Sequence, residues 1–145
     1  MEAIGLVCLY GITSLDDLRT KQVRLLEIII FGIIGIIFNI IYRAYSLQSI
    51  LGGVGIGIAI MCFSIFSKEK IGKGDAYIIM VTGLYLGFIN TLLLLWFSTI
   101  LAAITGIILI RKYDNKMSME IPFVPFLLLG YIILYLIHAI GEILI

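Results

Sequence analysis

Long runs of apolar residues, separated by short polar connections, follow one another along the whole chain. None of these runs alternates apolar and polar residues as a half-buried strand would, and each is long enough for a helix. The pattern therefore predicts helices and no strands. The six predicted spans cover residues 3–16, 25–42, 47–66, 75–89, 91–110 and 123–144.

Composition places these helices in a membrane. The chain has 145 residues, of which 62% are hydrophobic and 13% are charged. A soluble domain is typically about 45–50% apolar and about 25% charged. A soluble fold of this size cannot bury so much apolar surface, so the expected solvent is lipid. We therefore predict an all-α, polytopic membrane protein that forms one transmembrane domain over residues 1–145, with helices as the spanning elements.

The basic residues predict the orientation of the chain. Nine of the ten lie in the first, third and fifth connections, and only Arg43 lies in the second. Short connections rich in lysine and arginine stay on the cytoplasmic side of a membrane. Both termini are therefore expected to be extracytoplasmic. The nine residues are Arg19, Lys21, Arg24, Lys68, Lys70, Lys73, Arg111, Lys112 and Lys116.

Other features argue against several classes of partner. The net charge is +1 and no block of like charge is present, so a nucleic-acid partner is not expected. Cys8 and Cys62 lie in apolar runs without a CxxC or CxxH pattern, and we expect them to be small buried hydrophobes. His138 is the single histidine and cannot form a zinc site alone. No metal and no cofactor are expected.

Three aspartates stand out once the topology is drawn. Asp16 and Asp17 close the first span and Asp75 opens the fourth, which places all three on the cytoplasmic side. The spans 3–16 and 75–89 would rise only about 21–23 Å, against a bilayer core of about 30 Å. Either these helices continue into the polar connections or the bilayer thins locally. Acids at the edge of a membrane, or within it, are candidates for function.

A pair of carboxyl groups within hydrogen-bonding reach can hydrolyse a peptide bond. The two groups share one proton, because both cannot easily ionise at that distance. One then acts as a base towards water while the other donates a proton to the substrate carbonyl, without a metal or a nucleophilic serine. Spacing alone leaves a simpler interpretation open. Asp17 and Asp75 would then be ordinary interfacial acids, and Asp75 would stabilise a helix N-terminus.

Three short segments carry a family resemblance. The segment GKGD, Gly72 to Asp75, resembles the GxGD motif of intramembrane aspartyl proteases. The segment DLRTKQV, Asp17 to Val23, resembles the other catalytic motif of the type IV prepilin peptidases. The segment IPFVPFL, Ile121 to Leu127, resembles the Pro-Phe-x-Pro-Phe segment that opens the last helix of that family. The three segments occur in the family's order and span most of the chain.

The resemblance implies roles for particular residues. Asp17 and Asp75 would be the two catalytic aspartates, with Asp16 as the alternative to Asp17. Gly72 and Gly74 would be the motif glycines beside the substrate. Glycine would let the backbone approach a bound strand closely or adopt a positive φ ahead of the helix. A plain loop-to-helix turn is the alternative interpretation of both glycines.

The chain departs from the family pattern at three positions. Arg24 stands where the first motif often has proline, Tyr77 where a lysine often follows the second aspartate, and Val124 where a glycine separates the two prolines. None of these changes removes a group that the chemistry requires, but they put the substrate preference in doubt. Pro122 and Pro125 are also compatible with an ordinary helix start.

The resemblance further implies an activity and a place in the cell. It implies a membrane-embedded aspartic endopeptidase that removes the short basic leader of pilin, pseudopilin or archaellin-like precursors. The active site would face the cytoplasm of a prokaryotic cell, at its cytoplasmic membrane. No connection is large enough for the methyltransferase domain that many relatives carry, so methyl transfer is not expected. The alternative is a non-catalytic six-helix assembly factor or a small transporter.

Two pairs of glycines predict close contacts between helices. Gly53 and Gly57 are four residues apart, as are Gly83 and Gly87. Small residues at this spacing let membrane helices approach one another closely. We expect both pairs to lie at contacts within the bundle, with a dimer interface as the alternative.

Overall fold

The computed structural model describes residues 2–20, 23–42, 45–66, 72–113 and 122–144. These residues form helices and no strand, so the predicted all-α class is confirmed. The helices are α1 (Glu2–Thr20), α2 (Leu25–Tyr42), α3 (Leu47–Phe66), α4 (Lys73–Tyr113) and α5 (Val124–Leu144). Several residues used above lie outside the described ranges, namely Lys21, Arg43, Lys68, Lys70, Lys116 and Ile121.

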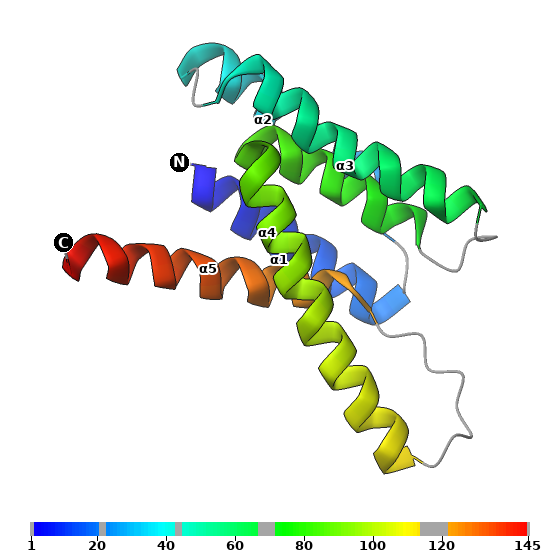
Figure 1. The fold of residues 1–145 in the computed structure, drawn as a ribbon. Coiled ribbons are helices and arrows are strands. Elements are labelled where there is room, and N and C mark those ends of the chain that lie inside the picture. Colours follow the sequence, from blue (N-terminus) through cyan, green and yellow to red (C-terminus); the bar gives the residue numbers. More distant parts are fainter. Residues whose placement is uncertain (1, 21–22, 43–44, 67–71, 114–121, 145) are drawn as a thin grey trace.

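The structure describes five helices where the hydropathy pattern predicts six. The predicted spans 75–89 and 91–110 both fall in α4, whose two helical halves meet at a break at Gly87, close to the predicted connection around Asn90. Only Gly87 leaves helical geometry inside α4, with φ of 68° and ψ of −171°, a conformation available essentially to glycine alone. Figure 1 shows the two halves of α4 running in different directions from this break. Six separate spans are therefore not confirmed.

Side chains from two other helices compensate for the break in α4. In an unbroken helix the Phe88 N–H would donate to the Leu84 C=O. Here the Phe88 N–H donates to Ser49 Oγ of α3 at 3.1 Å, and the Leu84 C=O accepts from Asn39 Nδ2 of α2. This compensation matters because lipid offers no partner to a free backbone group.

The two predicted glycine pairs pack against each other. A Cβ atom at Gly53 of α3 would lie 2.8 Å from Gly83 Cα of α4, and one at Gly57 would lie 2.6 Å from the Met80 backbone nitrogen. Both pairs therefore form a contact between α3 and α4, as predicted. Figure 1 shows α3 lying alongside the first half of α4, the half that begins with Asp75.

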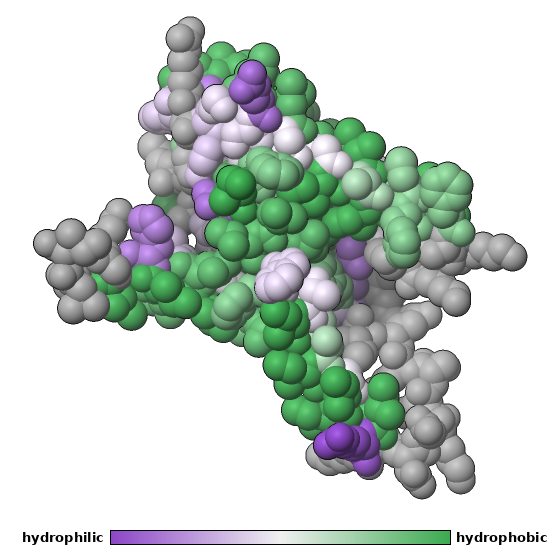
Figure 2. All heavy atoms as spheres, viewed as in Figure 1, coloured by the Kyte–Doolittle hydropathy of each residue, from purple (hydrophilic) through white to green (hydrophobic). Residues whose placement is uncertain are grey.

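The outside of the bundle is apolar. Leu47 is 72% exposed and Phe66 is 87% exposed, and apolar residues cover most of the face drawn in Figure 2. Three helices are long and apolar enough to cross a membrane: Leu25–Tyr42, Leu47–Phe66 and Lys73–Arg111. Cys8 and Cys62 are exposed rather than buried, so that prediction is wrong. An exterior facing lipid accepts the same small apolar side chains as a core, which is why the composition did not distinguish the two.

The helix ends lie on two opposite sides of the molecule. In Figure 1 the N- and C-termini lie on one side, while the end of α1 and the starts of α4 and α5 lie towards the other. Helix α1 continues to Thr20, so it extends into the polar connection instead of ending at residue 16. Its 19 residues rise about 28 Å, close to the bilayer core of about 30 Å. Asp17 therefore lies inside the last helical turn.

Candidate active site

The structure brings Asp17 and Asp75 together. Asp17 lies in the last turn of α1, where it is buried with 7% of its surface exposed. Asp75 lies in the first turn of α4 and is partly buried. Their carboxyl groups are close enough to interact electrostatically. Helices distant in sequence thus supply two acids that lie near each other at the same end of the bundle.

The start of α5 holds the Asp17 side chain. The Val124 N–H donates to Asp17 Oδ2 at 3.2 Å, and the Phe123 N–H also donates to this carboxyl group. The first N–H groups of a helix have no partner within it, and the proline nitrogens of Pro122 and Pro125 carry no hydrogen. Phe123 and Val124 are thus the free donors between the prolines. Asp17 caps α5 from another helix, at the end where a negative charge is stabilised.

The two motif glycines play different parts. The Asp75 N–H donates to the Gly72 C=O at 3.2 Å, and a Cβ at Gly72 would lie 3.4 Å from Asp75 Oδ2. A Cβ at Gly74 would lie 3.2 Å from Val23 Cγ2, which is a tighter contact. Among the described residues the positive φ belongs to Gly87, so neither Gly72 nor Gly74 uses a left-handed backbone. Gly74 allows a close contact with Val23 of the same chain, and the approach of either glycine to a bound strand stays a prediction.

The three sequence motifs meet at this end of the bundle. Val23 of the first motif contacts Gly74 of the second, and Asp17 of the first binds the start of α5, where the third motif lies. The contact between Asp17 and α5 was not foreseen from the sequence. Its signal was the pair of prolines, because they leave only Phe123 and Val124 with free N–H groups.

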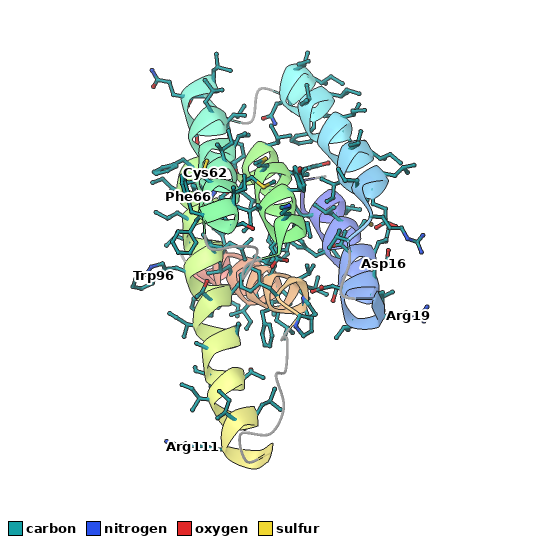
Figure 3. The ribbon with its side chains drawn as sticks, turned by 90° about the vertical axis from the view of Figure 1, so that its right-hand side faces the viewer. Asp16, Arg19, Cys62, Phe66, Trp96 and Arg111 are labelled. Carbon is teal, nitrogen blue, oxygen red and sulfur yellow. The ribbon has the colours of Figure 1, made fainter. Side chains whose placement is uncertain are left out.

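Asp16 has different surroundings from Asp17. Its Oδ2 lies 3.1 Å from Arg24 Nε, and Arg24 Nη1 lies 4.0 Å from Glu27 Oε1. Asp16 and Arg19 lie on the outer side of the α1 end, away from α4 and α5 (Figure 3). These positions favour Asp17 over Asp16 as the partner of Asp75, and the catalytic assignment itself stays a prediction.

The three departures from the family pattern also have places in the structure. Arg24 forms the ion pair with Asp16 and begins the turn into α2, because its C=O accepts from the Glu27 N–H at 3.1 Å. Tyr77 is partly buried against the core. Val124 is fully buried, and its N–H still reaches Asp17 although its side chain is larger than the usual glycine. These three changes leave both carboxyl groups in place.

The described residues hold no group of three or more histidine, cysteine, aspartate or glutamate side chains that could bind a metal ion. At this end of the bundle the carboxyl groups of Asp17 and Asp75 lie near each other beside the N-terminus of α5. No curated protein and no solved structure matches the chain. The family model of the type IV leader peptidases, which are proteases, matches residues 4–140, nearly the whole sequence. The chain therefore belongs to the type IV leader peptidase family.

Proposed function

We propose that this protein is an aspartic endopeptidase that removes the short basic leader of type IV prepilin-like precursors. The meeting of Asp17 and Asp75 at the ends of two helices distant in sequence carries this proposal. Residues 1–145 would act as a single transmembrane peptidase domain without methyltransferase activity. The glycines Gly72 and Gly74 would place the start of α4 beside the substrate backbone.

The mechanism uses one water molecule and the two carboxyl groups. The ionised carboxyl group takes a proton from water while the other donates its proton to the oxygen of the scissile carbonyl. The water oxygen bonds to the carbonyl carbon and gives a tetrahedral diol. Proton transfer to the nitrogen and loss of a hydroxyl proton then break the C–N bond, which leaves a new carboxyl end and a new amino end. The N–H groups at the start of α5 hold Asp17 in place during these steps.

The location of the pair suits a substrate that is half in the membrane. The exterior of the bundle is apolar, so the apolar helix of a precursor can lie beside it in the same bilayer. The pair lies at one end of the bundle, where α1 ends and α4 begins. The bond between a polar leader and an apolar helix would lie at the same depth. The basic connections assign this end to the cytoplasmic face, so the enzyme would act at the prokaryotic cytoplasmic membrane.

The test is cleavage of a co-expressed prepilin-like precursor by four forms of the protein: wild type, Asp17→Asn, Asp75→Asn and Asp16→Asn. Asparagine keeps the size of the side chain but can neither act as the base nor share the proton. We expect the wild type and D16N to remove the leader, and D17N and D75N to insert normally without cleaving. N-terminal sequencing of the product identifies the bond.

Each other outcome has a definite meaning. Cleavage by D75N would refute the paired-carboxyl assignment, and loss of cleavage in D16N with activity in D17N would transfer the first role to Asp16. Absence of cleavage by a correctly inserted wild type, across pilin, pseudopilin and archaellin-like precursors, would favour the non-catalytic assembly factor or transporter.

A further inference from the structure

A buried hydrogen bond joins α1 to α4 away from the two carboxyl groups. The hydroxyl of Tyr10 lies 2.7 Å from Thr82 Oγ1, and both residues are buried. Thr82 Oγ1 donates its own hydrogen to the Ile78 C=O at 2.8 Å. A hydroxyl group has one hydrogen to donate, so Tyr10 is the donor to Thr82.

This hydrogen bond lies at the same distance from the aspartate on each of the two helices. Tyr10 precedes Asp17 by about two helical turns, and Thr82 follows Asp75 by the same number of residues, a rise of about 10.5 Å on each helix. Residues two turns apart lie on nearly the same face of a helix, within about 20°. Each helix therefore presents a hydroxyl group and a carboxyl group to the other helix, in opposite order along the chain.

Because of this equal spacing, the hydrogen bond can fix the register of α1 against α4. If α1 moved along α4 by an ångström, the distance between the two carboxyl groups and that between the two hydroxyl groups would change together. A hydrogen bond between hydroxyl groups keeps its oxygens about 2.5–3.0 Å apart, so it resists such sliding. Its apolar surroundings strengthen that resistance, because no water replaces a lost partner there.

The Tyr10 ring also contacts the third helix of the site. Its centroid lies 5.9 Å from that of Tyr131 on α5, with the planes inclined at 64°. Edge-to-face contacts of this kind are favourable between aromatic rings. Tyr10 therefore touches α4 and α5, the two helices whose starts meet Asp17.

We infer that Tyr10 and Thr82 are positioning residues that set the separation of the Asp17 and Asp75 carboxyl groups through the hydrogen bond between their helices. The inference rests on the proposed function, since it assigns these residues to the same reaction. Neither residue touches the substrate, and both act only through the register of α1 against α4.

The test compares activity with stability in Tyr10→Phe, Thr82→Val, the double variant and Thr82→Ser. Tyr85→Phe is the matched control, because the Tyr85 hydroxyl donates to the Phe31 C=O at 2.9 Å and so joins α4 to α2 instead. For each form we would measure kcat and KM for the prepilin-like precursor, and thermal unfolding in detergent.

Stability and activity should respond differently. T82V leaves the Tyr10 hydroxyl buried without an acceptor, so it should be the least stable form. The double variant should be more stable than T82V, because it leaves no buried polar group without a partner. All three forms without the bond should lose about tenfold to a hundredfold in kcat at unchanged KM, since small displacements of reacting groups cost that much. T82S and Y85F should keep the wild-type kcat. If the double variant regains both stability and kcat, the role is only structural and the inference is wrong.

A second measurement needs no cleavage and separates this inference from the proposed function. Cysteines replace Asp17 and Asp75 in a background where Cys8 and Cys62 are serine, and a short bifunctional thiol reagent joins them. Tyr10→Phe should lower the yield of the crosslink, and Y85F should leave it unchanged. An unchanged yield in Y10F would overturn the inference even if the wild type cleaves. A lowered yield would support it even if no precursor is cleaved.

Discussion

Helices α3 and α4 pack so closely at Gly83 that an added methyl group has no space. A Cβ at Gly83 would lie 2.6 Å from both the Gly53 oxygen and the Val54 nitrogen. Carbon and its neighbours prefer separations of about 3.5–4.0 Å. Both neighbours are backbone atoms, which cannot rotate away as a flexible side chain can. Gly83→Ala must therefore separate the two helices or distort one of them.

The size of the effect can be isolated with a matched control. Overpacking of this kind costs about 1–3 kcal/mol, whereas alanine gains about 1 kcal/mol over glycine in helix propensity. A Cβ at Gly55 of α3 would have no neighbouring heavy atom within 4 Å, so Gly55→Ala should show the gain in helix propensity without any steric cost. The difference between the two variants therefore measures the contact. We expect G83A to be about 1–3 kcal/mol less stable than G55A, roughly 5- to 150-fold in the unfolding equilibrium.

The assay is unfolding in mixed micelles with increasing sodium dodecyl sulfate, followed by the fluorescence of the single tryptophan, Trp96. G83A should unfold first, and G55A with or after the wild type. Equal midpoints for G83A and G55A would show that α3 and α4 are not in backbone contact at Gly83. Cleavage by G83A should fall as well, because Gly83 follows Asp75 on the same half of α4.

Two further substitutions test the break in α4 and the contact between the first two motifs. Gly87→Ala should destabilise the protein by about 1–3 kcal/mol in the same titration, because alanine is strained at φ of 68° and ψ of −171°; a wild-type midpoint would mean that the break is absent in the membrane. Gly74→Ala should lower kcat by less than about tenfold, because its Cβ would displace Val23 by a few tenths of an ångström. The double variant Val23→Ala/Gly74→Ala should have a kcat close to that of the wild type, and a double variant as slow as G74A would refute steric crowding as the cause.

The helical class and the location of the two aspartates at the same end of the bundle follow from general rules. Lipid accepts helices as spanning elements, so a chain that is 62% hydrophobic without alternation is predictably all-α. The basic connections place the ends of spans on one side or the other, which brought Asp17 and Asp75 to the same end before any motif was considered. The glycine pairs were also predictable, because only close contact between helices favours such spacing.

The hydrogen bond of Asp17 to α5 was not predicted, and the break at Gly87 was predicted only as a boundary between two spans around Asn90. The sequence did not indicate that the free backbone groups at the break are satisfied by Asn39 and Ser49 from other helices. The hydrogen bond from α5 to Asp17 depends on which N–H groups have no partner within the helix, and on where the start of α5 lies in the folded protein. In both cases the partner comes from an element distant in sequence, so the local pattern can mark the position but cannot name the partner.

These two features suggest why the site lies where it does. In a membrane the interior of a helix has all its backbone groups paired, so polar chemistry must be placed at helix ends or breaks. At the break in α4, the Leu84 C=O and the Phe88 N–H are occupied by neutral side chains. At the start of α5, the free N–H groups are occupied instead by a carboxyl group that also lies beside Asp75. Backbone groups at helix ends and breaks must be paired in a membrane. At the break in α4 this requirement is met by Asn39 and Ser49, and at the start of α5 it is met by Asp17, which is thereby held in a fixed orientation beside Asp75.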